Sequence, residues 1–335
     1  MLGFNESELR AQIDSALALR PAIEELAEEL VDAGIDSILL VGSGGTYAQM
    51  WPHEYNANRI SKLPVRSAIS RELILSGDAL LGPNTLVVFT SASGTTEDVL
   101  AAMDYVNEQG AKSVSFTCDE GSPIAKAATY NTLTALPKTW PFDMQLTFLL
   151  GKIFSLRGEF DGYESLADEM VDHLTDALVS AAHEADDQAS AFADSHADTD
   201  YHFLIGGGPL WGFTYLYSMC VLEEMQWLHT TRVNSAEFFH GSLELLESDT
   251  SVIVFQGEDE TRPLTDRAES FAKRISNDVT VFDTKNYALE GFSPENRAII
   301  APIVLDIVMG RVSKHLERVR DHDLTLRRYY RVMEY

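Results

Sequence analysis

The stretch SILLVGSGGT, residues 37–46, decides the fold class of this chain. Its apolar first half lacks polar alternation, which predicts a strand buried on both faces. The glycines and small hydroxyl residues that follow predict a sharp turn into a helix. The same order, an apolar strand and then a hydroxyl-rich turn, returns in TLVVFTSASGTT at residues 85–96.

Helices alternate with these strands in the first half of the chain. Apolar residues recur at helical spacing over residues 5–34, where Pro21 is expected to kink or divide the helix. Further helices are expected at 47–60 and 97–109, and a third strand at 113–117. Short apolar strands that alternate with helices predict an α/β fold, in which a mainly parallel, doubly wound (flavodoxin-like) sheet carries helices on both faces.

The second half repeats this plan after a connector rich in Ala, Asp and Glu. A strand at 201–205 leads into the turn Gly-Gly-Gly-Pro and a helix expected over 210–229. Later elements are expected as strands near 231–234, 251–255 and 279–282, and as a helix that Ser293 caps and that ends near 315. The expected domains are residues 1–160, a helical connector at 161–197, a second domain at 198–320 and a tail at 321–335.

Composition excludes several classes of function. The 52 Asp and Glu against 25 Lys and Arg give a formal net charge of −27, so no nucleic-acid partner is expected. No apolar run reaches the roughly 18 residues that a membrane span needs, and the N-terminus lacks the pattern of a secretory signal. Cys118 and Cys220 are expected to be buried free thiols, which favours the cytoplasm.

The two hydroxyl-rich turns predict a phosphate site. Small residues let the backbone approach an anion, and the free N–H groups at a helix start point towards it. Neither turn carries the Gly-Lys-Ser/Thr of a P-loop or the Gly-x-Gly-x-x-Gly of a dinucleotide site. No Cys/His set has zinc spacing, so we expect neither a metal nor a cofactor.

At this point the chain resembles a known family. The turns GSGGTYA (42–48) and SASGTTEDV (91–99) are similar to the two phosphate-binding turns of SIS (sugar isomerase) domains, such as the isomerase half of glucosamine 6-phosphate synthase. EEMQWLH (223–229) and NSAEFFHGSLE (234–244) resemble the catalytic helix and loop of that family. RRYYRVMEY (327–335) is similar to the tail of fructoselysine 6-phosphate deglycases.

The resemblance implies two SIS domains and a set of site residues. It gives the catalytic base to Glu224 and the acid/base partner to His240, with Glu223 as the alternative base. It gives the tail a place over the active site, and it implies a homodimer or larger homo-oligomer with shared sites. The implied phosphate ligands are Ser43, Gly44, Gly45, Thr46, Ser91, Ser93 and Thr96, and the supporting residues are Glu237, His229, Arg327 and Arg328.

The chemistry of an Amadori sugar agrees with a catalytic pair of Glu224 and His240. Such a sugar has a ketone at carbon 2 and an amine on carbon 1, so a carboxylate can remove a proton from carbon 1. A glutamate surrounded by apolar residues such as Met219 and Leu228 is expected to be buried and therefore more basic than a solvated one. A histidine suits proton transfer at oxygen near neutral pH.

Three functions remain open from the sequence. The first is a deglycase that cleaves a 6-phosphorylated fructosamine to glucose 6-phosphate and a free amino acid, whose identity is not fixed. The second is a SIS-type aldose–ketose isomerase or a glucosamine 6-phosphate deaminase, and the third is a non-catalytic sugar-phosphate sensor. The synthase reaction is disfavoured, because Val221 replaces a lysine of that branch and no N-terminal cysteine follows Met1.

Aromatic residues also suggest a partner subunit. Phe238 and Phe239 are adjacent, and two adjacent aromatic side chains are not expected to enter the core of one subunit together. Tyr329, Tyr330 and Tyr335 need a similar cover.

Overall fold

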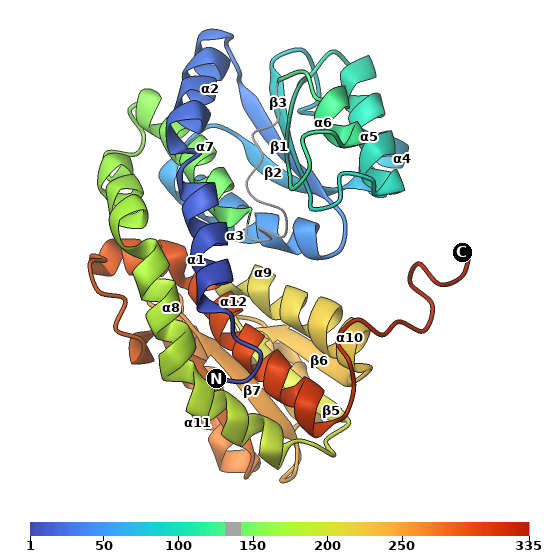
Figure 1. Cartoon of the computed structure of the whole chain (residues 1–335), viewed down its shortest axis with the longest axis vertical. Helices are drawn as coiled ribbons and strands as arrows, with labels where there is room; N and C mark the ends of the chain where they lie inside the picture. Colours follow the sequence, from blue (N-terminus) through green and yellow to red (C-terminus); the bar gives the residue numbers. More distant parts are fainter. Residues whose placement is uncertain (131–141, 335) are drawn as a thin grey trace. The chain divides into compact units, whose positions relative to one another are not determined.

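The computed structural model describes residues 1–130 and 142–334. The chain forms two compact units (Figure 1). The N-terminal unit comprises Asn5–Asp176, and the C-terminal unit comprises Ala177–Tyr335 together with Met1–Phe4. The long helix α8, Tyr163–Ser195, contributes residues to both units.

The sheet of the N-terminal unit is parallel throughout. Its strand order is β2-β1-β3-β4. The central strands β1 and β3 are buried along their whole length, as their apolar sequences predict. The strands are β1 (Ser37–Gly42), β2 (Val65–Ile69), β3 (Thr85–Ser91) and β4 (Lys112–Thr117).

Helices cover both faces of this sheet. On one face, Val41 and Phe89 pack against Leu73 of α4, Met103 of α5 and Ile124 of α6. Pro21 lies in the first turn of α2, so it begins a second helix and does not kink a single long one. The helices are α1 (Glu6–Leu17), α2 (Arg20–Asp32), α3 (Gly45–Ile60), α4 (Ser70–Ser76), α5 (Glu97–Glu108), α6 (Pro123–Ala127) and α7 (Asp143–Leu156).

The C-terminal unit has the same topology. Its parallel strands follow the order β6-β5-β7-β8, which matches the N-terminal sheet strand for strand. The repeat of architecture predicted from the sequence is therefore confirmed. The strands are β5 (Tyr201–Gly206), β6 (His229–Asn234), β7 (Ser251–Gln256) and β8 (Val279–Asp283).

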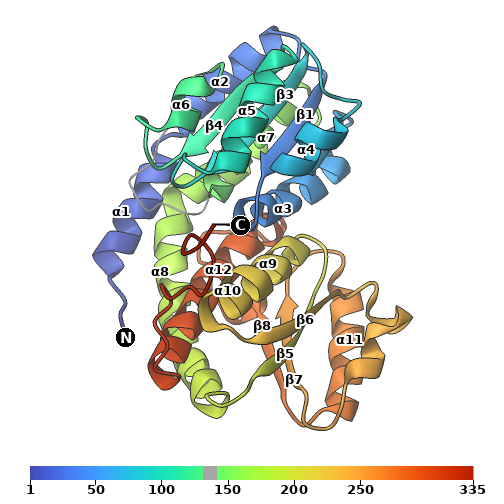
Figure 2. The ribbon, with the colours of Figure 1, turned by 90° about the vertical axis from the view of Figure 1, so that its right-hand side faces the viewer.

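The two faces of the second sheet carry different helices (Figure 2). Phe255 of β7 faces α9 and the π-helical segment η1, with its ring centroid 5.2 Å from that of Phe213 and 6.1 Å from that of Tyr217. Val254, its neighbour on β7, points to the other face and packs with Ala268 of α11. The helical elements are α9 (Leu210–Leu216), η1 (Tyr217–Glu223), α10 (Glu224–Gln226), α11 (Arg262–Ile275) and α12 (Pro294–Val319), with short 3-10 turns η2 (Phe238–His240), η3 (Ser242–Leu245) and η4 (Thr284–Asn286).

Some elements differ from the sequence predictions. The helix expected over 210–229 ends at Gln226, because Trp227 adopts a left-handed conformation with φ 57° and β6 already begins at His229. The strand β2 was not predicted, since it is a five-residue edge strand that is only partly buried. The helices α4, α6, α7 and α11 were not predicted either. Cys118 and Cys220 are free thiols as expected, but both are half-buried rather than buried.

Within residues 1–130 and 142–334, every helix is too short or too polar to cross a membrane.

Candidate functional site

The first hydroxyl turn joins β1 to α3. Gly44 has φ 60° and precedes the first residue of α3, and no side chain caps this helix start. The Thr46 hydroxyl closes the turn, because Oγ1 donates to the Ser43 carbonyl at 3.1 Å and accepts from the Ser43 N–H at 3.3 Å. The Ser43 hydroxyl is buried and has no hydrogen-bond partner among residues 1–130 and 142–334. A buried polar group of this kind costs free energy unless a ligand or water pairs with it.

The second hydroxyl turn joins β3 to α5. Gly94 has φ 61°, and its N–H donates to the Ser91 carbonyl and side chain, each at 3.2 Å. Ser93 accepts from the N–H and the hydroxyl of Thr95 and is exposed. Thr96 is the N-cap residue of α5, yet its side chain makes no capping hydrogen bond. The turn therefore presents hydroxyl groups and the start of a helix to solvent.

Both turns lie at one edge of one sheet. The strands β1 and β3 are paired in parallel, with Val41 opposite Phe89, so the two turns leave neighbouring strand ends. Strand order reverses between these strands, and ligands of doubly wound sheets bind at such a switch point. Hydroxyls and helix-start N–H groups suit an anion such as a phosphate ester.

Gly94 and Gly44 give a matched test of the second turn. A Cβ on Gly94 would lie 2.3 Å from Ser122 Oγ, whereas one on Gly44 would meet nothing within 4 Å, although both glycines have the same positive φ. Gly44→Ala is expected to cost about 1–2 kcal/mol of unfolding free energy, because φ 60° with ψ −125° is strained for a residue with a Cβ. Gly94→Ala should cost about 3 kcal/mol, because the turn must also shift. Urea unfolding measures both; equal losses would mean that the contact with Ser122 constrains nothing.

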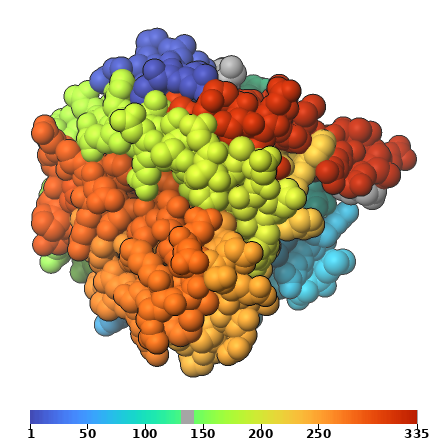
Figure 3. Space-filling model, turned by 90° about the horizontal axis from the view of Figure 1, so that it is seen from below, coloured from blue at the N-terminus to red at the C-terminus, as the bar shows by residue number. Residues whose placement is uncertain are grey.

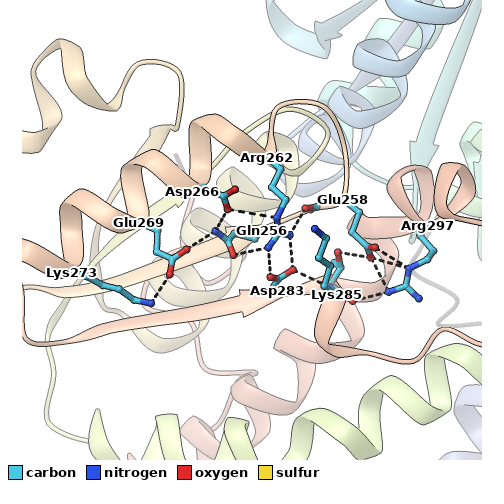
Figure 4. A network of polar contacts seen from close by, with 11 residues as sticks. Gln256, Glu258, Arg262, Asp266, Glu269, Lys273, Asp283, Lys285 and Arg297 are labelled. Carbon is cyan, nitrogen blue, oxygen red and sulfur yellow. Dashed lines mark hydrogen bonds and ion pairs between the residues drawn. The ribbon is translucent and has the colours of Figure 1, made fainter.

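The corresponding edge of the C-terminal sheet is built differently (Figure 4). Arg262 of α11 pairs with Asp283 at the end of β8 at 2.5 Å, and Arg297 of α12 pairs with Glu258 at 2.9 Å. A Cβ on Gly208 would lie 2.4 Å from Thr261 Oγ1, so the chain itself fills the space beside this glycine. Ion pairs within the unit therefore occupy the place that corresponds to the hydroxyl turns.

The Arg262–Asp283 pair stabilises this edge. Burial alone would raise the pKa of Asp283, but the hydrogen bonds from Arg262 and the Lys285 N–H, together with the charges of both residues, outweigh it and lower this pKa below the ordinary 3.8. Arg262→Met should cost about 2 kcal/mol and lower Tm by about 4–8 °C, because a shielded carboxylate loses its partner. The exposed Lys273→Met, which breaks an i,i+4 pair, is the control and should cost under about 0.5 kcal/mol.

This stabilisation has a defined pH dependence. A lowered folded-state pKa contributes stability above pH 3.8, and that contribution is lost as the pH falls through the lower value. The difference in Tm between wild type and Arg262→Met should therefore shrink below about pH 4. A difference that stays constant from pH 7 to pH 3 would assign the effect to packing instead of charge.

Glu224 begins α10, directly after the π-helical segment η1. A π-helical turn is rare and often lies at a functional site, because it changes which side chains face the same direction. Glu224 Oε1 accepts a hydrogen bond from Arg327 Nε at 2.8 Å. Its side chain is 31% exposed, so the buried glutamate expected from the apolar neighbours is in fact half-buried and ion-paired.

Glu223, the alternative base, is held by β6. Its Oε1 accepts from Arg232 Nη1 at 2.8 Å and from the hydroxyl of Thr230. Arg232 also donates to Ser218 and lies over the ring of Tyr215. Glu223 therefore ties η1 to β6.

His240 and Glu237 follow the other end of β6 and are both exposed. The backbone N–H of His240 donates to the Glu237 carbonyl at 2.9 Å. Phe238 is buried, and Phe239 packs on Phe271, with ring centroids 5.6 Å apart, and beneath the Arg267 guanidinium. The same unit therefore covers much of Phe239, so the prediction that a partner subunit must bury this ring is wrong. Tyr329 and Tyr330 are exposed as expected, and Tyr335 lies outside the described residues.

One chain does not bring Glu224 and His240 together. Glu224 continues the helix on the α9 and α12 face of the sheet, whereas Phe238, two residues before His240, packs on the α11 face (Figure 2). They also flank opposite ends of β6, which is roughly 17 Å long at about 3.3 Å per residue. His229 is exposed at the start of β6, and its N–H donates to the Asp200 carbonyl.

The tail contacts the end of α10, and the sequence reasoning missed several of the residues involved. Gln226 Nε2 donates to the His322 carbonyl at 3.2 Å. The Trp227 ring lies 4.4 Å from that of His322 and 4.1 Å from the Arg328 guanidinium. Only the arginine pair of the tail was a signal in the sequence, because a contact between residues about 100 positions apart leaves no local pattern.

Comparisons with known proteins support this architecture. Residues 30–143 match the SIS domain family. The chain is 29% identical over 322 residues to fructosamine deglycase FrlB of Bacillus subtilis (strain 168), covering 93% of this chain and 97% of the relative. It is 26% identical over 317 residues to fructoselysine 6-phosphate deglycase of Escherichia coli (strain K12), covering 92% and 90%.

Solved structures show the same fold. A Bacillus subtilis crystal structure assigned to the phosphosugar isomerases has a TM-score of 0.88 at 28% identity and covers 98% of this chain and 100% of that one. The C-terminal domain of glucosamine-fructose-6-phosphate aminotransferase from Francisella tularensis has a TM-score of 0.80 at 16% identity, with 95% and 96% covered, which shows the fold alone.

The chain therefore has the two-sheet parallel α/β fold of phosphosugar isomerase structures, and residues 30–143 resemble the SIS domain family, so both the predicted fold class and the predicted family resemblance are confirmed. Its nearly full-length curated relatives are deglycases, which supports an enzyme of the SIS family.

Proposed function

We propose that the protein is a deglycase that cleaves a 6-phosphorylated fructosamine to glucose 6-phosphate and a free amino acid. One observation carries the proposal: two hydroxyl turns meet at the switch point of a sheet in a chain that matches a fructosamine deglycase over 93% of its length. The turns would hold the 6-phosphate, through Ser43, Gly44, Gly45, Thr46, Ser91, Ser93 and Thr96.

In this proposal Glu224 moves the proton that converts the ketose into an aldose. It removes a proton from carbon 1, the electron pair forms a double bond to carbon 2, and the ketone oxygen gains a proton from His240. Protonation of this enaminol at carbon 2 leaves an imine between carbon 1 and nitrogen. Water adds at carbon 1 and the carbon–nitrogen bond breaks, which releases the amine and leaves the aldehyde of glucose 6-phosphate.

The working unit of the proposed enzyme is at least a homodimer. Glu224 lies before the start of β6 on the α12 face, whereas His240 lies beyond the end of β6, next to Phe238, which packs on the other face; the proposal therefore takes His240 from a second copy. Exposed residues of the tail suit the same interface, and in Figure 3 the end of the chain, in dark red, projects from the surface. The two free thiols support a location in the cytoplasm.

A substrate panel separates the deglycase from a glucosamine 6-phosphate deaminase and from a sensor. The protein is incubated with fructoselysine 6-phosphate, fructose-aspartate 6-phosphate and glucosamine 6-phosphate, and glucose 6-phosphate and ammonia are assayed. If the protein is a deglycase, glucose 6-phosphate should form from at least one fructosamine, and no ammonia should form from glucosamine 6-phosphate. Ammonia from glucosamine 6-phosphate alone would indicate a deaminase, and binding without any product would indicate a sensor.

A further inference from the structure

The segment from His322 to Arg328, called here the tail clasp, holds the end of the helix that carries Glu224. The contacts with Gln226 and Trp227 fix the segment against α10. Arg327 Nη1 donates to the carbonyls of Leu324 and Leu326, each at 2.8 Å. These bonds orient the guanidinium, so that its Nε meets the Glu224 carboxylate.

While the ion pair between Arg327 and Glu224 persists, it opposes the proposed reaction. The Oε1 atom that accepts this hydrogen bond points towards the guanidinium and is therefore not directed at a proton on carbon 1 of a substrate. The side chain of Arg327 is 19% exposed and that of Glu224 is 31% exposed, so solvent and solutes reach both partners. Another carboxylate could therefore take the place of Glu224 on the guanidinium.

We propose that Arg327 is a specificity-determining residue that exchanges Glu224 for a carboxylate on the amine half of the substrate. The inference rests on the proposed function. In the proposed substrates, the carboxylate of the amino-acid half both binds Arg327 and frees Glu224. Arg232, a second cation near Glu224, is engaged by Glu223 and Ser218. In a chain of net charge −27, an incoming carboxylate needs such a cation.

The exchange keeps the guanidinium paired throughout. Arg327 gives up one carboxylate and gains another, so the cation is not left unpaired near the site. A fructosamine from a simple amine lacks the second carboxylate and leaves Arg327 on Glu224. Such a substrate should bind through its phosphate and turn over slowly.

Two adducts of matched size test the exchange. The 6-phosphorylated fructosamines of glycine and of ethylamine differ chiefly in the carboxylate, and glucose 6-phosphate release gives kcat and KM for each. Wild type should prefer the glycine adduct by about ten- to a hundred-fold in kcat/KM, as expected for a charged hydrogen bond. In Arg327→Met the preference should fall to about one, and the ethylamine adduct should turn over at least as fast as with wild type.

Two further variants, Arg328→Met and Arg327→Lys, serve as controls. Arg328 contacts Trp227 through its cation, so its loss disturbs the tail clasp but should keep the preference for glycine. A lysine at position 327 retains the positive charge but lacks the fixed planar geometry of the guanidinium, so it should keep part of the preference for the glycine adduct. Thermal unfolding of each variant shows that it is folded.

Several results would overturn the exchange. An unchanged preference in Arg327→Met, or no preference in wild type, would contradict it while leaving the deglycase function intact. Equal losses on both adducts in Arg327→Met and Arg328→Met would show that Arg327 only anchors the tail. If neither adduct nor any other fructosamine 6-phosphate released glucose 6-phosphate, the proposed function would fail and the exchange with it.

Discussion

Glu224→Gln is expected to lower the turnover of a fructosamine 6-phosphate by about a hundred- to ten-thousand-fold, because the amide cannot accept the proton from carbon 1. Its carbonyl oxygen can still accept the hydrogen bond of Arg327, so the tail clasp should stay in place. Binding of glucose 6-phosphate should change little, since the substitution alters none of the proposed phosphate ligands. Steady-state kinetics and calorimetric binding measure the two effects.

Glu223→Gln is the matched control, one position earlier on the helix. Glu223 is paired with Arg232 and Thr230, so its loss should act mainly on stability. Near wild-type turnover by Glu224→Gln, with a large loss in Glu223→Gln, would reverse the assignment of the base.

A mixture of inactive Glu224→Gln and inactive His240→Ala protein is expected to regain activity. Opposite faces of the sheet carry the two residues, so a complete site takes one residue from each subunit. Random exchange in a dimer would place both native residues in about a quarter of all sites. Activity should therefore rise from near background to about a quarter of the wild-type value.

Subunit exchange must be demonstrated in the same mixture, by two tags that are purified in sequence. Recovered activity should follow the amount of doubly tagged protein. Exchange without any recovered activity would place both functional residues in one subunit and contradict the shared site.

The sheets could be predicted because their signal is local. The residues of β1 and β3 are apolar along their whole length, which is typical of strands buried on both faces, and each strand passes into a hydroxyl turn. The adjacency of these turns follows from parallel pairing, so the candidate phosphate site could also be proposed before the structure.

Elements whose signals depend on distant residues were missed. The helix α7 is apolar on nearly all sides and has no helical period to detect, because other helices cover it. The edge strand β2 has the polar Arg66 and Ser67 at its centre. The helix α11 was missed for a different reason. It is amphipathic, and the helical spacing of its apolar residues was visible in the sequence.

The surroundings of Glu224 also could not be predicted. Apolar neighbours in the sequence suggested a buried base, but η1 and the left-handed Trp227 end the helix so that Glu224 meets the tail. Arg327 is 103 residues away in the chain, and no local pattern encodes such a contact. The arginine pair in an acidic chain was the one hint of an anion partner.

The most direct test of the proposed function is to identify the sugar that the wild-type protein releases from a fructosamine 6-phosphate, by carbon-13 NMR of the labelled sugar. Proton transfer from carbon 1 to carbon 2 followed by hydrolysis must give an aldose 6-phosphate, which the account predicts to be glucose 6-phosphate, with one free amine for each sugar released. Displacement of the amine at carbon 1 without that transfer would leave fructose 6-phosphate. Formation of fructose 6-phosphate, or of no product from any fructosamine 6-phosphate, would contradict the account.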